Sequence, residues 1–185
     1  MIIQKQKPWS RLSKKAKRIR IAEDVLMQLD SGKFIASGGY FNIYNVNGYS
    51  DRTQVQTLLK DESNGVRCAG CAKGAIFAAM VLETNSLTLK RSFSMVSSTM
   101  LDTKNLLEFT RNQLDLIETA YEGVVIKQTN RDLDNSPAKK EAIRFNSRYN
   151  DTEGLIKIRE KCLRGIMRNI IKNEGYFIPG KTLLK

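Results

Sequence analysis

The stretch VRCAGCAKGAIFAAMVL at residues 66–82 decides the fold of this chain, because it is small and apolar on nearly every side. Its small residues include Ala69, Gly70, Ala72, Gly74, Ala75, Ala78 and Ala79. A helix that is apolar all round has to be buried between other elements. The stretch is interrupted by Lys73 and falls short of the roughly 20 apolar residues that cross a bilayer. We therefore expect it to form the central buried helix of a mainly helical domain, and not a membrane span.

Apolar residues at spacings of three and four predict further helices around this stretch. They are expected at residues 12–29, 53–60 and 102–121, from Pro137 to near Arg148, and at residues 155–170. Capping residues support these limits. Ser10 is expected to cap the first helix, Ser136 the fourth and Thr152 or Asp151 the last, while Gly32, Gly123 and Gly175 follow helix ends.

Two runs rich in aromatic and branched residues, KFIA and YFNIYNV, lie within residues 33–46 and are separated by Ser37, Gly38 and Gly39. This pattern predicts an antiparallel hairpin with a three-residue turn. A hairpin alone is marginal in water, so it has to pack on the helices or gain a third strand. Residues 86–96 are a candidate for another strand. The expected fold class is therefore α+β, mainly α, with a small antiparallel hairpin or sheet on one side of a compact helical domain.

The length of 185 residues suits one domain, with a basic N-terminal arm at residues 1–11 and a tail at residues 176–185 that docks by Tyr176, Phe177 and Ile178. The N-terminus lacks the apolar segment of a secretory signal. Three cysteines are too few for a disulfide framework, and an odd number fits a reducing compartment. We expect a cytoplasmic protein, with a virion as the alternative location.

The net charge of +12 is concentrated at the two ends of the chain. Residues 1–20 hold eight Lys and Arg and no acid, and residues 155–185 hold eight against Glu160 and Glu174. The expected first helix carries Lys14, Lys15, Lys17, Arg18 and Arg20, and the last carries Lys157, Lys161, Arg164, Arg168 and Lys172. Such basic surfaces attract acidic partners, of which nucleic acid is the commonest. The simpler interpretation is that the charge only keeps the protein in solution.

Enzymatic chemistry is not indicated by the sequence, because the chain contains no histidine. No glycine-rich phosphate loop is found. The paired carboxylates Glu23 with Asp24, Asp61 with Glu62, and Asp132 with Asp134 are interpreted as solvated. Tyr40, Phe41, Tyr44 and Tyr49 offer faces for stacking on bases, but core packing is the preferred interpretation. We expect no enzyme activity and no cofactor.

Cys68 and Cys71 form a C-x-x-C motif that allows three interpretations. A thiol-disulfide site needs the pair at a helix N-terminus, where a thiolate is stabilised. A zinc site would use both residues and Cys162 but lacks a fourth Cys or His ligand. In the third interpretation, which we prefer, the cysteines are small core residues.

Three segments together give a resemblance: KRIRIAEDVLMQLDSGKFIASGGYF, CAGCAKGAIFAAMV and IMRNIIKNEGYFIP. The chain resembles small uncharacterised accessory proteins of tailed bacteriophages and mobile elements. The resemblance implies a setting, an infected bacterial cytoplasm or a virion, and no residue-specific role. Combined with the basic helices, it predicts a non-enzymatic protein that binds DNA, RNA or a nucleoprotein. The alternatives are a protein that docks on an acidic partner surface, such as an inhibitor of a host defence complex, and a structural protein of the virion.

Overall fold

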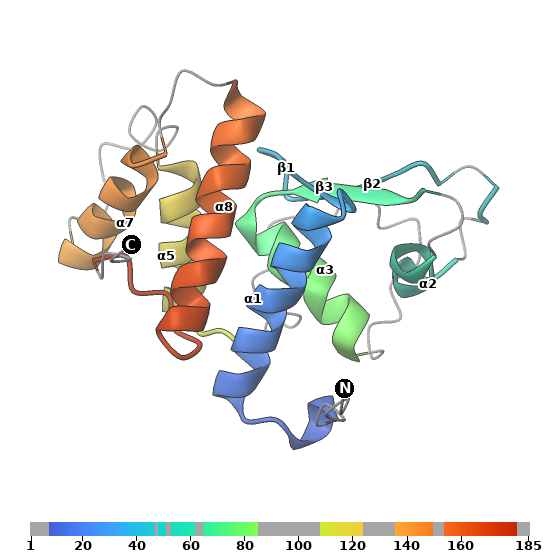
Figure 1. Cartoon of the computed structure of the whole chain (residues 1–185), viewed down its shortest axis with the longest axis horizontal. Helices are drawn as coiled ribbons and strands as arrows, with labels where there is room; N and C mark the ends of the chain where they lie inside the picture. The colour runs from blue at the N-terminus through green and yellow to red at the C-terminus, as the bar shows by residue number, and fades with distance from the viewer. Residues whose placement is uncertain are drawn as a thin grey trace, which may run out of the picture.

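The computed structural model describes residues 8–46, 48–50, 53–61, 65–84, 108–123, 136–149 and 154–180. These residues are mainly helical, with a small mixed sheet at one side (Figure 1), which confirms the expected α+β, mainly α class. The elements are η1 (Trp9–Arg11), α1 (Lys14–Asp30), β1 (Phe34–Ala36), β2 (Phe41–Tyr44), α2 (Val55–Lys60), β3 (Arg67–Gly70), α3 (Ala72–Thr84), α5 (Arg111–Glu122), α7 (Pro137–Ser147) and α8 (Leu155–Lys172). The candidate strand at residues 86–96 lies outside the described residues.

The prediction of a single helix at residues 66–82 is wrong. The stretch forms strand β3 followed directly by helix α3. Its first part is extended because it pairs with a strand on each side, and such pairing is set by partners distant in sequence. The backbone turns into α3 at Cys71, whose N–H donates to the carbonyl of Gly39 at 2.6 Å. The small residues therefore serve both a central strand and a buried helix.

The predicted hairpin is also wrong, because β1 and β2 do not pair with each other. The strand order is β1-β3-β2, with β3 in the centre. β1 pairs parallel to β3, with Phe34 opposite Cys68, and β2 pairs antiparallel to β3, with Ile43 opposite Cys68. The loop between β1 and β2 spans the width of β3, so the glycines there make a wider connection than a tight turn.

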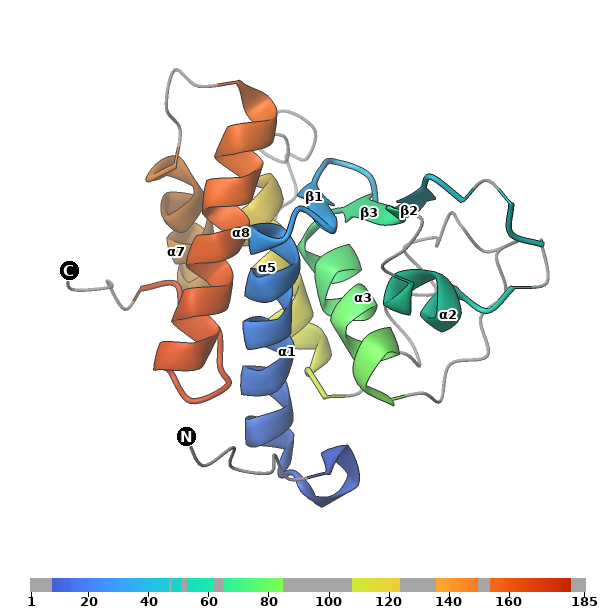
Figure 2. The same ribbon diagram turned by 45° about the vertical axis from the view of Figure 1, so that its right-hand side comes forward.

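Helix α3 forms the centre of the core. Every residue from Ala72 to Val81 is buried, and α3 contacts α1, α2, α5 and the sheet. Its Phe77 packs edge-on against Phe41 of β2, with ring centroids 5.2 Å apart. Figure 2 shows α3 with α1 on one side and α2 on the other, below the strands. α8 packs against α1 and α5, and α7 packs against α5.

Several helix boundaries differ from the expected ones. The cap of α1 is Ser13, whose Oγ accepts from the N–H of Ala16, while Ser10 belongs to η1. α5 begins at Arg111 after its cap Thr110, later than residue 102, and residues 101–107 lie outside the described ranges. α8 begins after Gly154, so neither Thr152 nor Asp151 is its cap. The caps of α1 and α8 thus lie two or three residues later than predicted, because tertiary packing contributes to where a helix starts.

Two further expectations are confirmed. α7 begins at Pro137 after Ser136, whose Oγ accepts from the N–H of Lys139. The segment after α8 docks by Phe177, which is buried and packs edge-on against Phe145. Asn169 of α8 fixes this segment, since its side chain donates to the carbonyl of Ile178 and accepts from the N–H of Ile178. Tyr176, in contrast, is exposed.

Candidate nucleic-acid interface

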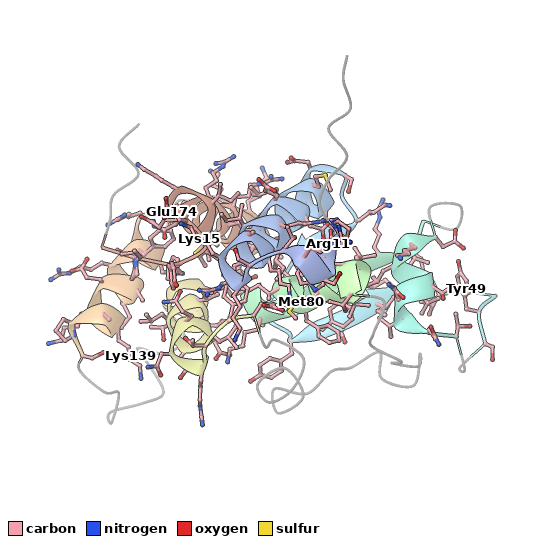
Figure 3. The ribbon with its side chains drawn as sticks, turned by 90° about the horizontal axis from the view of Figure 1, so that it is seen from below. Arg11, Lys15, Tyr49, Met80, Lys139 and Glu174 are labelled. Atoms are coloured by element: carbon pink, nitrogen blue, oxygen red, sulfur yellow. The ribbon has the colours of Figure 1, made fainter. Side chains whose placement is uncertain are left out.

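Helices α1 and α8, which carry all ten predicted site residues, lie side by side and run antiparallel (Figure 1). Two ion pairs link them. Lys15 near the start of α1 pairs with Glu174 just after α8, as Figure 3 shows, and Asp30 at the end of α1 pairs with Arg164 at 2.5 Å. The two basic ends of the sequence are thereby brought together on one side of the molecule.

The cations of α8 form one continuous stripe. Lys157, Lys161, Arg164, Arg168 and Lys172 follow one another at spacings of four, three, four and four residues, which places them on one helix face. All of them except Arg164 are exposed. Lys157, Arg168 and Lys172 form no ion pair with any residue in the described part of the chain. Their positive charge is therefore directed to solvent and available to a partner.

The cations of α1 divide into two groups. Lys14 and Lys15 are exposed in the first turn, close to the end of α8. Lys17 pairs with Glu108 at 3.0 Å and also lies over the ring of Trp9, and Arg20 pairs with Glu83 at 2.8 Å. These pairs offset the unfavourable crowding of cations at the N-terminal end of α1. Lys17 and Arg20 therefore connect α1 to neighbouring segments.

Arg18 is buried, with only 5% of its surface exposed. Its Nη1 donates to the carbonyl of Gly175 at 3.2 Å, and its guanidinium lies 4.4 Å from the centre of the Tyr176 ring. Its role is to fasten the end of the chain onto α1. With so little of its surface exposed, Arg18 offers almost no contact area to a partner in solution.

The cysteine motif is part of the core. Cys68, Cys71 and Cys162 are buried free thiols. Burial raises the pKa of Cys68 to about 12 and that of Cys71 to about 11, although backbone N–H groups at the start of α3 favour the thiolate of Cys71. Such thiols stay protonated at neutral pH, which supports the core interpretation over a redox site. In the described part of the chain, no three Cys, Asp or Glu side chains are placed to hold a metal ion.

The aromatic residues of β2 and its flanks also divide. Phe41 is buried, while Tyr40 and Tyr44 are exposed. Tyr49 is partly buried and its hydroxyl donates to Asp61. Core packing is therefore correct for Phe41 and wrong for Tyr40 and Tyr44, which are exposed to solvent.

The interpretation of all the paired carboxylates as solvated is wrong for Asp24. Glu23 is exposed, but the neighbouring Asp24 is largely buried and accepts from the side chain of Gln28 at 2.6 Å. Burial raises the pKa of Asp24 to about 6, partly opposed by this hydrogen bond. Asp132 and Asp134 lie outside the described residues. Asp24 lies one helical turn before Gln28, but the burial of both residues comes from the tertiary fold and is not visible in the sequence.

The core also contains an ion pair that the sequence pattern did not predict. Lys73 in the first turn of α3 is almost fully buried and pairs with Glu118 of α5 at 2.5 Å. Near it, Arg159 of α8 lies 3.9 Å from Glu122 of α5. These pairs link α3 and α8 to α5. The sequence signal for the first pair is a lysine within an apolar stretch, because a buried charge needs a partner of opposite charge.

Comparison with known protein families, with curated proteins and with solved structures finds no match to this chain. The resemblance to phage accessory proteins therefore stays a prediction. Within the described residues, no helix has the length and apolar character needed to span a membrane.

Proposed function

We propose that this protein binds nucleic acid, without catalysis, through one cationic face. The face consists of the exposed basic residues of α8 and of the first turn of α1: Lys14, Lys15, Lys157, Lys161, Arg168 and Lys172. The observation that carries the proposal is the antiparallel packing of α1 on α8, which joins cations more than 140 residues apart in sequence into one surface. Residues 21–154 carry a net charge of about −2, so the excess positive charge of the chain belongs to its two ends, which include this face.

The shape of this face favours phosphate contacts over base reading. The stripe from Lys157 to Lys172 is straight and spans roughly 22 Å at 1.5 Å per residue. Lysine and arginine ends at one-turn intervals suit a row of backbone phosphates, which carry no sequence information. Helix α8 is also packed against α1 and the core and is linked to α1 by ion pairs. It therefore does not project from the protein, as a helix that inserts into a nucleic-acid groove does. We therefore expect binding with little sequence preference.

Fluorescence anisotropy with a labelled duplex DNA and a labelled RNA of similar length tests the proposal. Affinity should fall steeply between about 50 mM and about 200 mM salt, because bound cations release counterions from the phosphates. The variant Arg168→Glu with Lys172→Glu should lose at least about tenfold in affinity and lower the salt slope by about two. The control Arg111→Glu with Lys140→Glu makes the same charge change at exposed positions of α5 and α7. An equal loss of affinity in both variants would show that net charge, and not this face, determines binding. No binding at low salt would refute the proposal.

An acidic protein surface is the second candidate partner, and one observation favours it. Leu155 and Ile156, each 61% exposed, lie at the start of α8 next to Lys157. An apolar pair beside cations is typical of protein interfaces. For this function, Leu155→Ser with Ile156→Ser should abolish retention of a partner from nuclease-treated lysate and leave affinity for nucleic acid unchanged. Retention that is lost on nuclease treatment instead favours nucleic acid.

A further inference from the structure

A pocket of about 610 Å³ lies on the opposite side of α1 from α8, and the proposed function does not use it. The pocket is bounded by the second half of α1, by α2, by the start of β3 and by the end of α3, and Figure 2 shows α1 and α2 on either side of α3. Its lining residues are Asp24, Met27, Gln28, Asp30, Ser31, Lys33, Leu59, Lys60, Val66, Cys68 and Leu82. The volume is within the range of small-molecule sites.

The walls of this pocket are mainly apolar. Met27, Leu59, Val66 and Leu82 are the apolar residues of the lining, and the thiol of Cys68 adds a weakly polar patch that is protonated at neutral pH. Met27 is 64% exposed although it is a large apolar side chain. Such walls favour a ligand with a compact hydrocarbon body.

Asp24 is the more buried of the two carboxylates that line the pocket, because Asp30 is exposed and pairs with Arg164 of α8. Its carboxylate accepts from Gln28, and it forms no ion pair with a described residue. The charges that act on it are Glu83 of α3, which disfavours its ionisation, and Arg20 of α1 and Lys33 before β1, which favour it. Burial outweighs them and raises its pKa to about 6. At neutral pH most of the molecules therefore carry a poorly solvated negative charge at the pocket wall.

We propose that this pocket binds a small organic cation, a primary amine on an apolar body, whose ammonium group pairs with the carboxylate of Asp24. The apolar body then lies against Leu59, Val66 and Leu82. A buried carboxylate gains more from a charged partner than a solvated one, because the low dielectric strengthens their attraction. Lys60 is exposed, so its long chain can carry its charge to water at the rim. Arg20 and Lys33 already act on Asp24, so a bound cation gains less than it would beside an isolated carboxylate.

Isothermal titration with three ligands of one shape tests the proposal: cyclohexylmethylamine, cyclohexylmethanol and cyclohexanecarboxylate. At about pH 7.5 the amine should bind at least about tenfold tighter than the alcohol, and the carboxylate weakest. Lowering the pH to about 5 should reduce the affinity for the amine about tenfold, since Asp24 is then ionised in only about a tenth of the molecules. The affinity for the alcohol should not change. Equal affinities of amine and alcohol, or tightest binding of the carboxylate, would overturn the proposal.

Two variants and a control locate the site. Asp24→Asn should reduce the affinity for the amine to that of the alcohol and remove its pH dependence. Glu23→Gln removes the same charge at the adjacent exposed position and should bind as the wild type does. Met27→Trp adds bulk at an exposed pocket wall, so it should remain folded and weaken all ligands. Amine binding that persists unchanged in Asp24→Asn or in Met27→Trp would show that the amine binds elsewhere and would refute the assignment.

Discussion

The carbonyl oxygen of Tyr40 occupies the position that a β-carbon on Gly74 would need. The loop between β1 and β2 therefore lies directly on the first turn of α3, and Gly74 is the residue that permits this approach. We predict that Gly74→Ala destabilises the protein by at least about 3 kcal/mol, because the clash is with backbone and cannot be relieved by a side-chain rotation. Urea unfolding measures the loss.

Gly154 is the matched control for this substitution. Like Gly74, it lies near the start of a helix, as the N-terminal cap of α8, but a β-carbon there would meet nothing within 4 Å. Gly154→Ala should change the free energy of unfolding by less than about 1 kcal/mol. Similar losses in the two variants would contradict the packing of Tyr40 on Gly74.

Asp24 should make stability depend on pH. Its pKa is about 6 in the folded protein and 3.8 as the ordinary value, so the unfolded chain releases this proton first as the pH rises. The stabilising contribution of the protonated carboxyl is therefore present below about pH 4 and lost as the pH passes through about 6. Asp24→Asn, which cannot ionise, should be the more stable protein at neutral pH by roughly 1–3 kcal/mol, and the difference should vanish below about pH 4.

Urea unfolding at a series of pH values tests this expectation, with Glu23→Gln as the control. The profile of the control should run parallel to that of the wild type, because Glu23 is exposed. An Asp24→Asn profile that is also parallel to the wild type would show that Asp24 is not desolvated in the folded protein.

Arg18 should matter for stability rather than for binding. Arg18→Met removes the hydrogen bond to Gly175 and the contact with the Tyr176 ring, and should cost about 1–3 kcal/mol. Lys14→Met, on the exposed first turn of the same helix, should leave the free energy of unfolding unchanged. The opposite order of the two variants would mean that Arg18 belongs to the cationic face.

The cysteines should be chemically silent in the folded state. With the thiol pKa of Cys68 at about 12 and of Cys71 at about 11, thiolate is scarce near pH 8 and the sulfur atoms are covered. Reaction with Ellman's reagent should be at least about a hundredfold slower than in urea. Rapid labelling of one or two thiols in the native protein would favour the redox interpretation of the C-x-x-C motif.

Local patterns in the sequence predicted the helices well and the sheet poorly. The Ser136 and Pro137 start of α7 depends on short-range backbone chemistry, and it was predicted correctly. Strand β3 was assigned to a helix because Ala69 and Gly70 have no local preference that outweighs pairing with two distant strands. The same limit applies to the order of the strands, which a periodic pattern does not contain.

The candidate site was predicted in part. The stripe of α8 follows from residue spacing alone, and all of its residues except Arg164 are exposed in the structure. Arg18 was assigned to the basic face although it lies four residues before Ala22 and seven before Val25, so it shares their buried side. Asp24 could not be distinguished from Glu23 by composition, because the elements that cover it come from distant parts of the chain.

The packing of α1 on α8 has a consequence for biosynthesis. Arg18 and its acceptor Gly175 are 157 residues apart, so α1 leaves the ribosome long before the helix that covers it. Until α8 has been synthesised, the apolar side of α1, with Ile21, Val25 and Leu29, lacks part of the packing that it has in the folded protein. Contacts of such long sequence separation slow folding, and apolar surface that is uncovered while a chain folds is open to chaperones and proteases. We therefore expect the surface formed by α1 and α8 to assemble only after α8 has been synthesised.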